Sequence, residues 1–232
     1  MATPEFLDHS RGDIRFLQLH LGGDRNFSYL LGDAASGEAA VVDPGFEPGR
    51  LLDIAVDHEL QIHHILITHG HSDHIGGAAR LVELTGAALY AGAEDRVPGA
   101  GPLADGQEIA LGGRPVQALR TPGHSPGHFC YLFEGHLVTG DILFCGKVGG
   151  TGDYFPGSSA EAQWDSLQRL LQLPDETGVF PGHDYYGGKG TMPRSTIGFE
   201  RSHNPFLAGG DFASFVHLKE NWATYKKEHG IR

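Results

Sequence analysis

Short apolar runs separated by turns recur along most of the chain, and their composition predicts β-strands. Each run is rich in β-branched or aromatic residues and is bounded by Gly, Pro, Asp or Asn, which is typical of strands. The expected strands are Ile14–Leu19, Phe27–Leu31, Ala40–Val42, Ile62–Ile67, Ala88–Tyr90, Val116–Leu119, His128–Phe133, His136–Val138 and Gly178–Phe180.

Apolar positions at helical spacing lie between these runs. The spacing predicts helices around Leu51–Ala55 and Ile75–Val82, and a third after Ser158-Ser-Ala-Glu161, which has the form of a capping box. An aromatic stripe from Phe212 to Tyr225 predicts a last helix, with Asp211 as its N-cap. Strands and helices interleave without a long linker. This order favours an α/β protein with two sheets face to face, helices outside them and functional loops along one edge.

The composition is that of a globular protein with one core. The chain has 232 residues, of which 40% are apolar and 20% are charged. This length is ordinary for one domain, so we expect a single domain over residues 1–232. No apolar stretch approaches the ~20 residues that a membrane-spanning helix needs, and the first residues lack the features of a signal peptide. We therefore expect a cytoplasmic protein without a membrane partner.

The net charge argues against nucleic-acid binding. It is −12, from 17 Lys plus Arg against 29 Asp plus Glu. Proteins that bind nucleic acid usually present a basic stripe, because neutralising phosphates supplies much of their affinity. We expect a small-molecule substrate instead. The sequence leaves the oligomeric state open.

The segment with the clearest chemistry is Thr68-His-Gly-His-Ser-Asp-His. It places His69, His71, Asp73 and His74 where an apolar run stops and a Gly-punctuated turn begins. All four side chains are good ligands for a borderline divalent metal. A buried core would have no use for them without such an ion, because unpaired polar groups are costly away from water. The segment therefore predicts a metal site.

Further ligand chemistry follows other strand-like runs, at His124 in Thr-Pro-Gly-His, Asp141 in Thr-Gly-Asp and His183 in Pro-Gly-His. Loops after strands are where a rigid scaffold presents functional groups. Counting ligands gives two metal sites. One is expected to hold His69, His71 and His124 and to leave a position for water, the other Asp73, His74 and His183, with Asp141 bridging both.

Two further side chains admit two interpretations each. Asp43, in Val-Val-Asp-Pro-Gly, could support a ligand or simply form the turn. His128, in Gly-His-Ser-Pro-Gly-His, could orient a ligand or make a local structural hydrogen bond.

The ordered motifs Thr-His-x-His-x-Asp-His, Thr-Pro-Gly-His, Thr-Gly-Asp and Pro-Gly-His resemble those of the metallo-β-lactamase superfamily, in particular its glyoxalase II and persulfide dioxygenase branches. The similarity runs from about Ile14 to Leu207. It implies a four-layer αββα sandwich and the same assignment of the seven ligands. Members that act as lactamases generally lack an aspartate at the bridging position, so Asp141 argues against that activity.

The leading hypothesis for the reaction is hydrolysis of an acyl-thioester such as a hydroxyacyl-glutathione by a metal-bound hydroxide. A zinc-bound water ionises near pH 7, and a thiol with a pKa near 8.5 leaves readily as thiolate. We expect Asp73 and Asp141 to serve catalysis as well as metal binding. Two zinc ions are expected, although iron and manganese suit the same donors.

The alternative is a mononuclear Fe(II) dioxygenase acting on glutathione persulfide, with iron on His69, His124 and Asp141, since two histidines and a carboxylate hold Fe(II) with positions open for oxygen. A metal-binding domain without turnover is a third, weaker interpretation. For the substrate, the resemblance implies contact with Tyr185. Gly150 stands where a basic residue is expected, and Lys147 is the candidate replacement.

Overall fold

The structure is a computed structural model that describes residues 5–23, 25–184 and 194–230. The first part of the chain forms a seven-stranded sheet whose strands lie in chain order. They are β1 (Phe6–Asp8), β2 (Ile14–Leu19), β3 (Ser28–Asp33), β4 (Glu38–Val42), β5 (Gln61–Leu66), β6 (Ala88–Ala91) and β7 (Gly101–Pro102). The pairs from β1 to β4 are antiparallel and those from β4 to β7 are parallel. The change of direction follows from the crossover helices, which parallel strands require.

The second part of the chain forms a six-stranded sheet with the order β15-β14-β11-β10-β9-β8 and a separate two-stranded sheet, β12-β13. The strands are β8 (Glu108–Leu111), β9 (Arg114–Arg120), β10 (Phe129–Phe133), β11 (His136–Gly140), β12 (Leu143–Phe144), β13 (Lys147–Val148), β14 (Gly178–Pro181) and β15 (Ser195–Thr196). β9, β11 and β14 run in one direction, because β10 is antiparallel to both β9 and β11 while β14 is parallel to β11.

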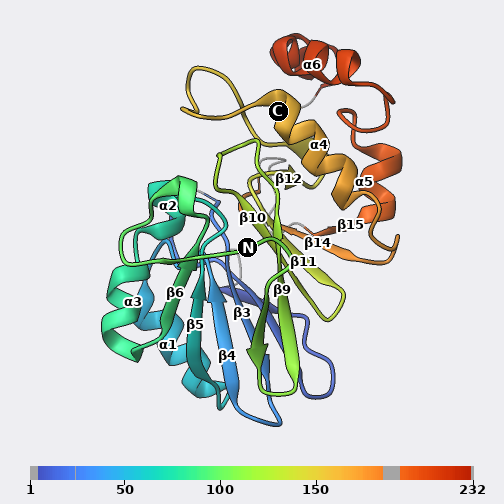
Figure 1. The fold of residues 1–232 in the computed structure, drawn as a ribbon. Helices are drawn as coiled ribbons and strands as arrows, with labels where there is room; N and C mark the ends of the chain where they lie inside the picture. Colours follow the sequence, from blue (N-terminus) through green and yellow to red (C-terminus); the bar gives the residue numbers. More distant parts are fainter. Residues whose placement is uncertain (1–4, 24, 185–193, 231–232) are drawn as a thin grey trace.

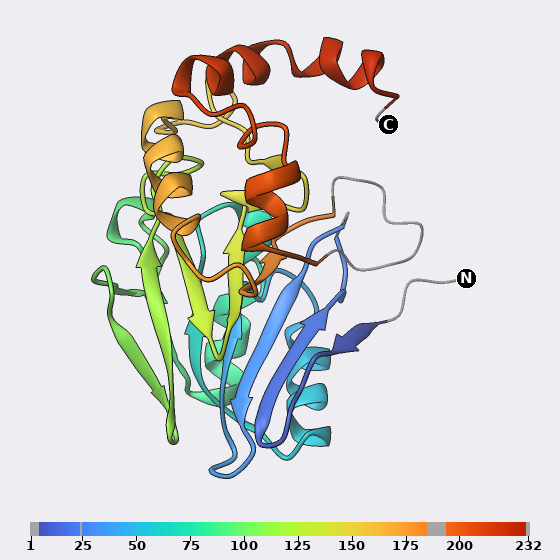
Figure 2. The same cartoon turned by 90° about the vertical axis from the view of Figure 1, so that its right-hand side faces the viewer.

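Helices cover the outer face of each sheet (Figure 1). The helices are α1 (Pro48–Asp57), α2 (Ser72–Ile75), α3 (Ala78–Thr85), α4 (Ala160–Leu170), α5 (Ile197–His203), α6 (Phe212–Glu220) and α7 (Trp222–Glu228), with a short 3₁₀ turn at Ala93–Asp95. α1 and α3 pack together on the first sheet, whereas α4 and α6 contact each other beyond the second. Figure 2 shows the C-terminal helices in red at one end of the molecule, next to α4.

Three apolar clusters fill the spaces between these layers. Leu51, Leu81 and Ile65 belong to a cluster between the first sheet and its helices. A second cluster, rich in aromatic residues such as Tyr29 and Tyr131, lies between the two sheets. The third joins the second sheet to α4, α5 and α6. Helix, sheet, sheet and helix therefore form four layers, which confirms the predicted αββα sandwich.

Local structure differs from the sequence predictions in two places. The hydroxyl of Ser159, and not of Ser158, caps α4 by accepting a hydrogen bond from the Ala162 N–H, because Ser158 is bonded to the backbone of Gly152. The aromatic C-terminal segment forms two helices instead of one. Asp211 caps α6 as predicted, but the helix is interrupted at Asn221, whose side chain donates to the carbonyl of His217.

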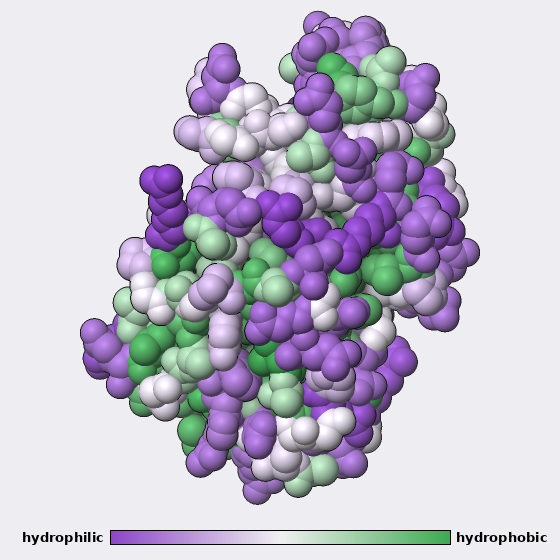
Figure 3. All heavy atoms as spheres, in the orientation of Figure 1, coloured by the Kyte–Doolittle hydropathy of each residue, from purple (hydrophilic) through white to green (hydrophobic). Residues whose placement is uncertain are grey.

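The visible surface is mostly hydrophilic. Hydrophilic residues cover most of the face shown in Figure 3, with apolar residues visible between them. Among the described residues, no helix has the length and apolar character that crossing a bilayer requires.

Candidate metal centre

The candidate ligands all lie just beyond the ends of strands. His69 and His71 follow β5 in the turn into α2, and Asp73 and His74 lie within α2 itself. His124 follows β9, Asp141 follows β11 and His183 follows β14. Because β9, β11 and β14 run in one direction, their ends lie at the same edge of the second sheet. The first sheet contributes four candidate ligands and the second contributes three.

Three imidazoles converge in the first group. The Nε2 atom of His69 lies 2.8 Å from Nδ1 of His71, which lies 3.2 Å from Nε2 of His124. The donor atoms of the three rings lie within 4.8 Å of one another, close enough to hold one ion. His69 and His124 are buried, while His71 is partly exposed. This group corresponds to the first metal site predicted from the sequence.

Asp73, His74 and His183 form the second group, and their donor atoms also lie within 4.8 Å of one another. The Nε2 atoms of His74 and His183 are 3.2 Å apart, and Oδ2 of Asp73 lies 3.3 Å from Nε2 of His183. Asn26 fixes the Asp73 carboxylate by donating to Oδ2 at 2.9 Å. No sequence motif points to Asn26, because its partner lies 47 residues away along the chain.

Asp141 lies between the two groups. Its Oδ2 atom is 3.7 Å from Nε2 of His124 and 3.4 Å from Nε2 of His183, and its Oδ1 atom is 3.6 Å from Nε2 of His74. The residue is only 5% exposed. Within the described part of the chain, Oδ1 has no hydrogen-bond partner. A buried carboxylate oxygen without a donor is costly, and a cation shared by the two groups would satisfy it.

Asp43 determines which ring nitrogen carries the proton in two candidate ligands, His74 and His69. Its Oδ2 atom accepts from Nδ1 of His74 at 2.8 Å and from the Thr68 hydroxyl at 2.6 Å. That hydroxyl in turn accepts from Nδ1 of His69 at 3.0 Å. In their neutral form both rings therefore carry the proton on Nδ1 and direct an unprotonated Nε2 into the site, the form a metal ligand requires. The structure thus favours the orienting interpretation of Asp43.

His124 and Asp141 are oriented from the second sheet and its loops. Nδ1 of His124 donates to the carbonyl of Gly150 at 2.8 Å, which leaves Nε2 for the site. The backbone N–H of Asp141 donates to Nε2 of His128 at 3.3 Å, and Nδ1 of His128 lies 2.9 Å from the Thr121 hydroxyl. His128 therefore acts on the backbone of Asp141, which supports the orienting interpretation of this histidine also.

Asp95 joins the two loops that carry the first group of imidazoles. Its carboxylate accepts from the Gly70 N–H at 2.8 Å, the Ser125 hydroxyl at 2.7 Å and the Gly127 N–H at 2.7 Å. Gly70 lies between His69 and His71, and Ser125 follows His124. Sequence reasoning missed Asp95, since it has no ligand motif and its partners are backbone atoms or a serine of distant segments.

Two glycines are required where the backbone passes close to Asp141. A Cβ atom on Gly182 would lie 2.4 Å from Oδ1 of Asp141 and 2.8 Å from Cε1 of His74. A Cβ atom on Gly149 would lie 1.8 Å from the Asp141 carbonyl oxygen and 3.1 Å from Nδ1 of His124. Any larger residue would displace the candidate ligands, so the backbone itself forms this wall of the site.

The electrostatics differ between the two groups of ligands. Burial lowers the pKa of His69, His71 and His124, so these rings are neutral with free lone pairs. Burial also acts to lower the pKa of His183, but Asp141 and Asp73 outweigh it and raise the pKa to about 10.

The carboxylates respond to the same charges. Burial raises the pKa of Asp141, yet His74 and His183 outweigh it and hold the pKa well below its usual range. Without an ion, protons on His74 and His183 thus supply the positive charge that the two carboxylates require. Neutral imidazoles, ionised carboxylates and an orphaned buried oxygen fit a divalent metal, and the donor set defines a metal-dependent enzyme site.

The two predicted substrate-binding residues have different outcomes. Lys147 lies in β13 and is partly buried, close enough for the Asp141 carboxylate to influence its ammonium. Burial and the Lys226 ammonium lower its pKa. Its contact with a substrate stays a prediction. Tyr185 lies outside the described residues.

Comparison with known proteins identifies the family. Residues 21–183 match the Metallo-beta-lactamase superfamily, and the chain belongs to it. A hydroxyacylglutathione hydrolase from Methylococcus capsulatus is 41% identical over 180 residues, which cover 74% of this chain and 67% of that protein. A probable polyketide biosynthesis zinc-dependent hydrolase, BaeB, from Bacillus velezensis is 34% identical over 167 residues, with coverage of 69% and 73%.

A solved structure supports the same conclusion. The crystal structure of ETHE1 from Myxococcus xanthus superimposes with a TM-score of 0.81 at 35% identity and covers 89% of this chain and 90% of that one. The predicted fold and family are confirmed, and the similarity to hydrolases confirms the prediction that the chain is a metallo-hydrolase. The chain spans only 52% and 62% of the length of two further relatives, so it corresponds to a part of those proteins.

Proposed function

We propose that the protein hydrolyses acyl-thioesters in the manner of glyoxalase II, with a hydroxyacyl-glutathione as the substrate class. The observation that carries this proposal is the position of Asp141, a buried carboxylate within 3.7 Å of imidazoles from both ligand groups. A bridging carboxylate of this kind suits two metals that share one nucleophile. The similarity to hydroxyacylglutathione hydrolases supports the choice of substrate.

We assign one divalent metal to His69, His71 and His124 and a second to Asp73, His74 and His183, with Asp141 between them. Zinc is the expected metal, and the zinc-dependent relative supports it. Iron and manganese suit the same oxygen and nitrogen donors. We further propose that residues 1–232 form one domain. The cytoplasmic location and the lack of nucleic-acid and membrane partners stay predictions, and the oligomeric state stays open.

The side chains determine where the reaction takes place. Metals bound here would supply an ionised water at neutral pH and polarise the thioester carbonyl. Asp141 is ionised at neutral pH and can accept a hydrogen bond from the attacking water. Asp73, held by Asn26, can do the same from the more open side, since its side chain is 39% exposed. The thiolate leaves without a dedicated acid because a thiol pKa is about 8.5.

The test is hydrolysis of S-lactoylglutathione by protein loaded with zinc, followed by thiol release. We expect turnover that chelation removes and zinc restores, and none in His69→Ala. Elemental analysis of protein purified without added metal should find two zinc ions per chain. Absence of metal-dependent cleavage of this and other acyl-thioesters would reject the proposal.

A second candidate, persulfide dioxygenase, is favoured by the convergence of His69, His124 and Asp141 and by the similarity to ETHE1. The ligand positions alone do not separate it from the hydrolase, but the hydrolase relatives favour hydrolysis. Oxygen uptake by iron-loaded protein given glutathione persulfide distinguishes the two. A single iron per chain with oxygen uptake and no thioesterase activity would establish the dioxygenase instead.

A further inference from the structure

Lys219 of α6 makes an unusual set of contacts for a lysine. Its ammonium donates to the backbone carbonyl of Gly149 at 2.8 Å and to Oε1 of Gln163 at 2.5 Å. Gln163, which is fully buried in α4, donates from Nε2 to the same Gly149 carbonyl at 3.1 Å. The three groups form a closed triangle that joins α4, α6 and the loop after β13. Hereafter this triangle is called the Lys219 clamp.

The clamp lies directly behind the metal centre. Gly149 packs against the Asp141 carbonyl and the ring of His124, as its lack of room for a Cβ shows. The next carbonyl, that of Gly150, accepts the Nδ1 proton of His124. Gln163 also packs against the loop that carries His124, since a Cβ atom on Gly123 would lie 2.3 Å from the Cα atom of Gln163. Movement of the Gly149–Gly150 peptide would therefore release the acceptor that orients His124.

The charge of Lys219 is not used in an ion pair. Within the described residues, no carboxylate lies within ion-pair distance of its ammonium, whose acceptors are neutral oxygens. Burial and the nearby Lys147 ammonium lower its pKa to about 7. A partly buried ammonium whose hydrogen-bond acceptors are neutral is unfavourable for stability. A cost of this kind is typical of functional positions.

We propose that Lys219 is a positioning residue of the metal centre, which holds the Gly149–Gly150 peptide in place and through it fixes His124 for metal binding. The C-terminal helices then support the metal centre through this peptide without contacting a metal ligand themselves. This proposal rests on the metal assignment made above, but it is independent of which substrate the enzyme cleaves.

The clamp is accessible from outside. Lys219, Gly149 and Gly150 line a pocket of about 390 Å³, together with Lys147, Glu220 and Trp222. A small amine can therefore reach the space left by a shortened Lys219. This allows the ammonium to be removed by mutation and supplied again from solution.

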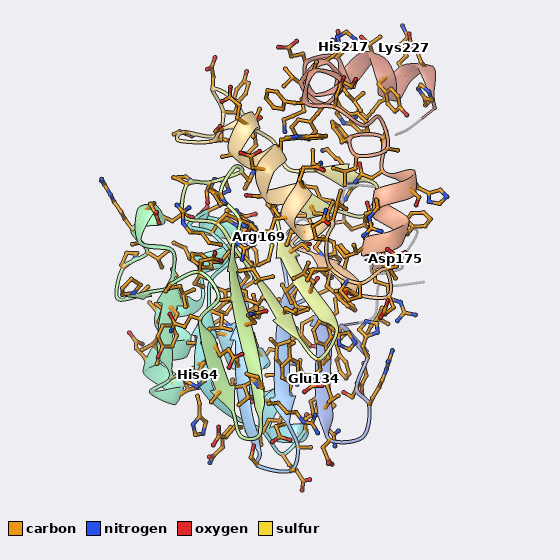
Figure 4. The ribbon with its side chains drawn as sticks, turned by 45° about the vertical axis from the view of Figure 1, so that its right-hand side comes forward. His64, Glu134, Arg169, Asp175, His217 and Lys227 are labelled. Carbon is orange, nitrogen blue, oxygen red and sulfur yellow. The ribbon has the colours of Figure 1, made fainter. Side chains whose placement is uncertain are left out.

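The experiment measures Co(II) binding by the visible absorption of the loaded protein, which needs no substrate. Lys219→Met keeps most of the packing and removes the ammonium, and we expect Co(II) affinity to fall about 10- to 100-fold, the usual effect of losing a group that orients a ligand. In Lys219→Ala, propylammonium should restore affinity and the wild-type spectrum, whereas 1-propanol, which can donate only one hydrogen bond, should not. Lys227→Met is the control. Its exposed side chain lies at the outer end of the C-terminal helices (Figure 4), and its affinity should equal that of the wild type.

Wild-type affinity and spectrum in Lys219→Met would overturn the proposal, as would equal rescue by the amine and the alcohol. Should Lys219→Met not fold, Lys219→Ala purified with propylammonium takes its place, and loss of Co(II) on removing the amine is the expected result. Because binding is measured without turnover, failure of the clamp is distinguishable from failure of the thioesterase proposal.

Discussion

Asp43→Asn is the change whose effect can be worked out most fully. Asp43 is 2% exposed and has a φ of 50°, a conformation that Asn tolerates well. The substitution therefore keeps the shape and the backbone. It changes one carboxylate oxygen into an amide nitrogen, which donates where the oxygen accepted.

The two carboxylate oxygens of Asp43 have separate, fixed donors. Oδ1 accepts from the Thr68 N–H at 2.7 Å, whereas Oδ2 accepts from Nδ1 of His74 at 2.8 Å and from the Thr68 hydroxyl at 2.6 Å. An amide has one oxygen and can accept on only one of these two sides. If the amide NH₂ group faces His74, the ring must carry its proton on Nε2, the atom directed at the second ligand group. If the NH₂ group faces Thr68, a buried backbone donor is left without an acceptor.

Either orientation costs about 1–3 kcal/mol, the usual penalty for a buried donor without a partner. At 1.4 kcal/mol per tenfold, the first orientation lowers metal affinity by about 5- to 140-fold. The second lowers the free energy of unfolding of the metal-free protein by the same energy. The metal-loaded protein is destabilised by about 1–3 kcal/mol in both cases.

Co(II) titration and denaturant unfolding, with and without metal, measure these quantities. Asp33→Asn is the matched control. Asp33 is also buried and accepts from the Gly113 and Ala35 N–H groups and from Arg114, so its stability should fall while Co(II) affinity stays unchanged. Wild-type affinity and wild-type stability together in Asp43→Asn would refute the reasoning.

Other predictions concern groups around the centre. Asp95→Ala removes the acceptor shared by the loops of His69 and His124, and isothermal titration should show Co(II) affinity reduced about tenfold; an unchanged value would contradict that role. Burial raises the pKa of Cys130 to about 12 and raises that of Cys145 as well, so iodoacetamide at pH 8 should modify neither thiol until the protein unfolds, as mass spectrometry can check. The pKa of Lys219 falls from 10.5 to about 7 on folding, so between these values the unfolded chain binds more protons and this group adds stability as pH rises. Denaturant unfolding at pH 7 and pH 10 should show that the free energy of unfolding rises less, or falls more, with pH in Lys219→Met than in the wild type.

The ligands are predictable from the sequence because their information is local. His69, His71, Asp73 and His74 lie within one short segment, and His124 and His183 each follow a Pro-Gly pair at the end of an apolar run. The same locality makes the long strands predictable, since β2 covers the expected Ile14–Leu19. Runs of β-branched or aromatic residues bounded by turn residues are a local signal of this kind.

The remainder depends on contacts that no local pattern records. The two-residue strands β7, β12, β13 and β15 are too short for any periodicity. Asp95 binds a backbone N–H 25 residues away, and Lys219 binds a carbonyl 70 residues away. The packing of the layers determines which groups meet in this way. A backbone N–H or carbonyl is present in almost every residue type, so the sequence does not indicate which one will be the partner.

Each ligand group draws two side chains from the first sheet and one from the second. A bound ion is therefore a cross-link between the two halves of the chain, and neither half alone retains all three ligands of either group. Ions held at 1,000 times their dissociation constant would add about 4 kcal/mol per site against separation of the halves. Two fragments divided between Pro102 and Glu108 should consequently reassemble more tightly when the metal is supplied, which makes the ion a contributor to assembly as well as to chemistry.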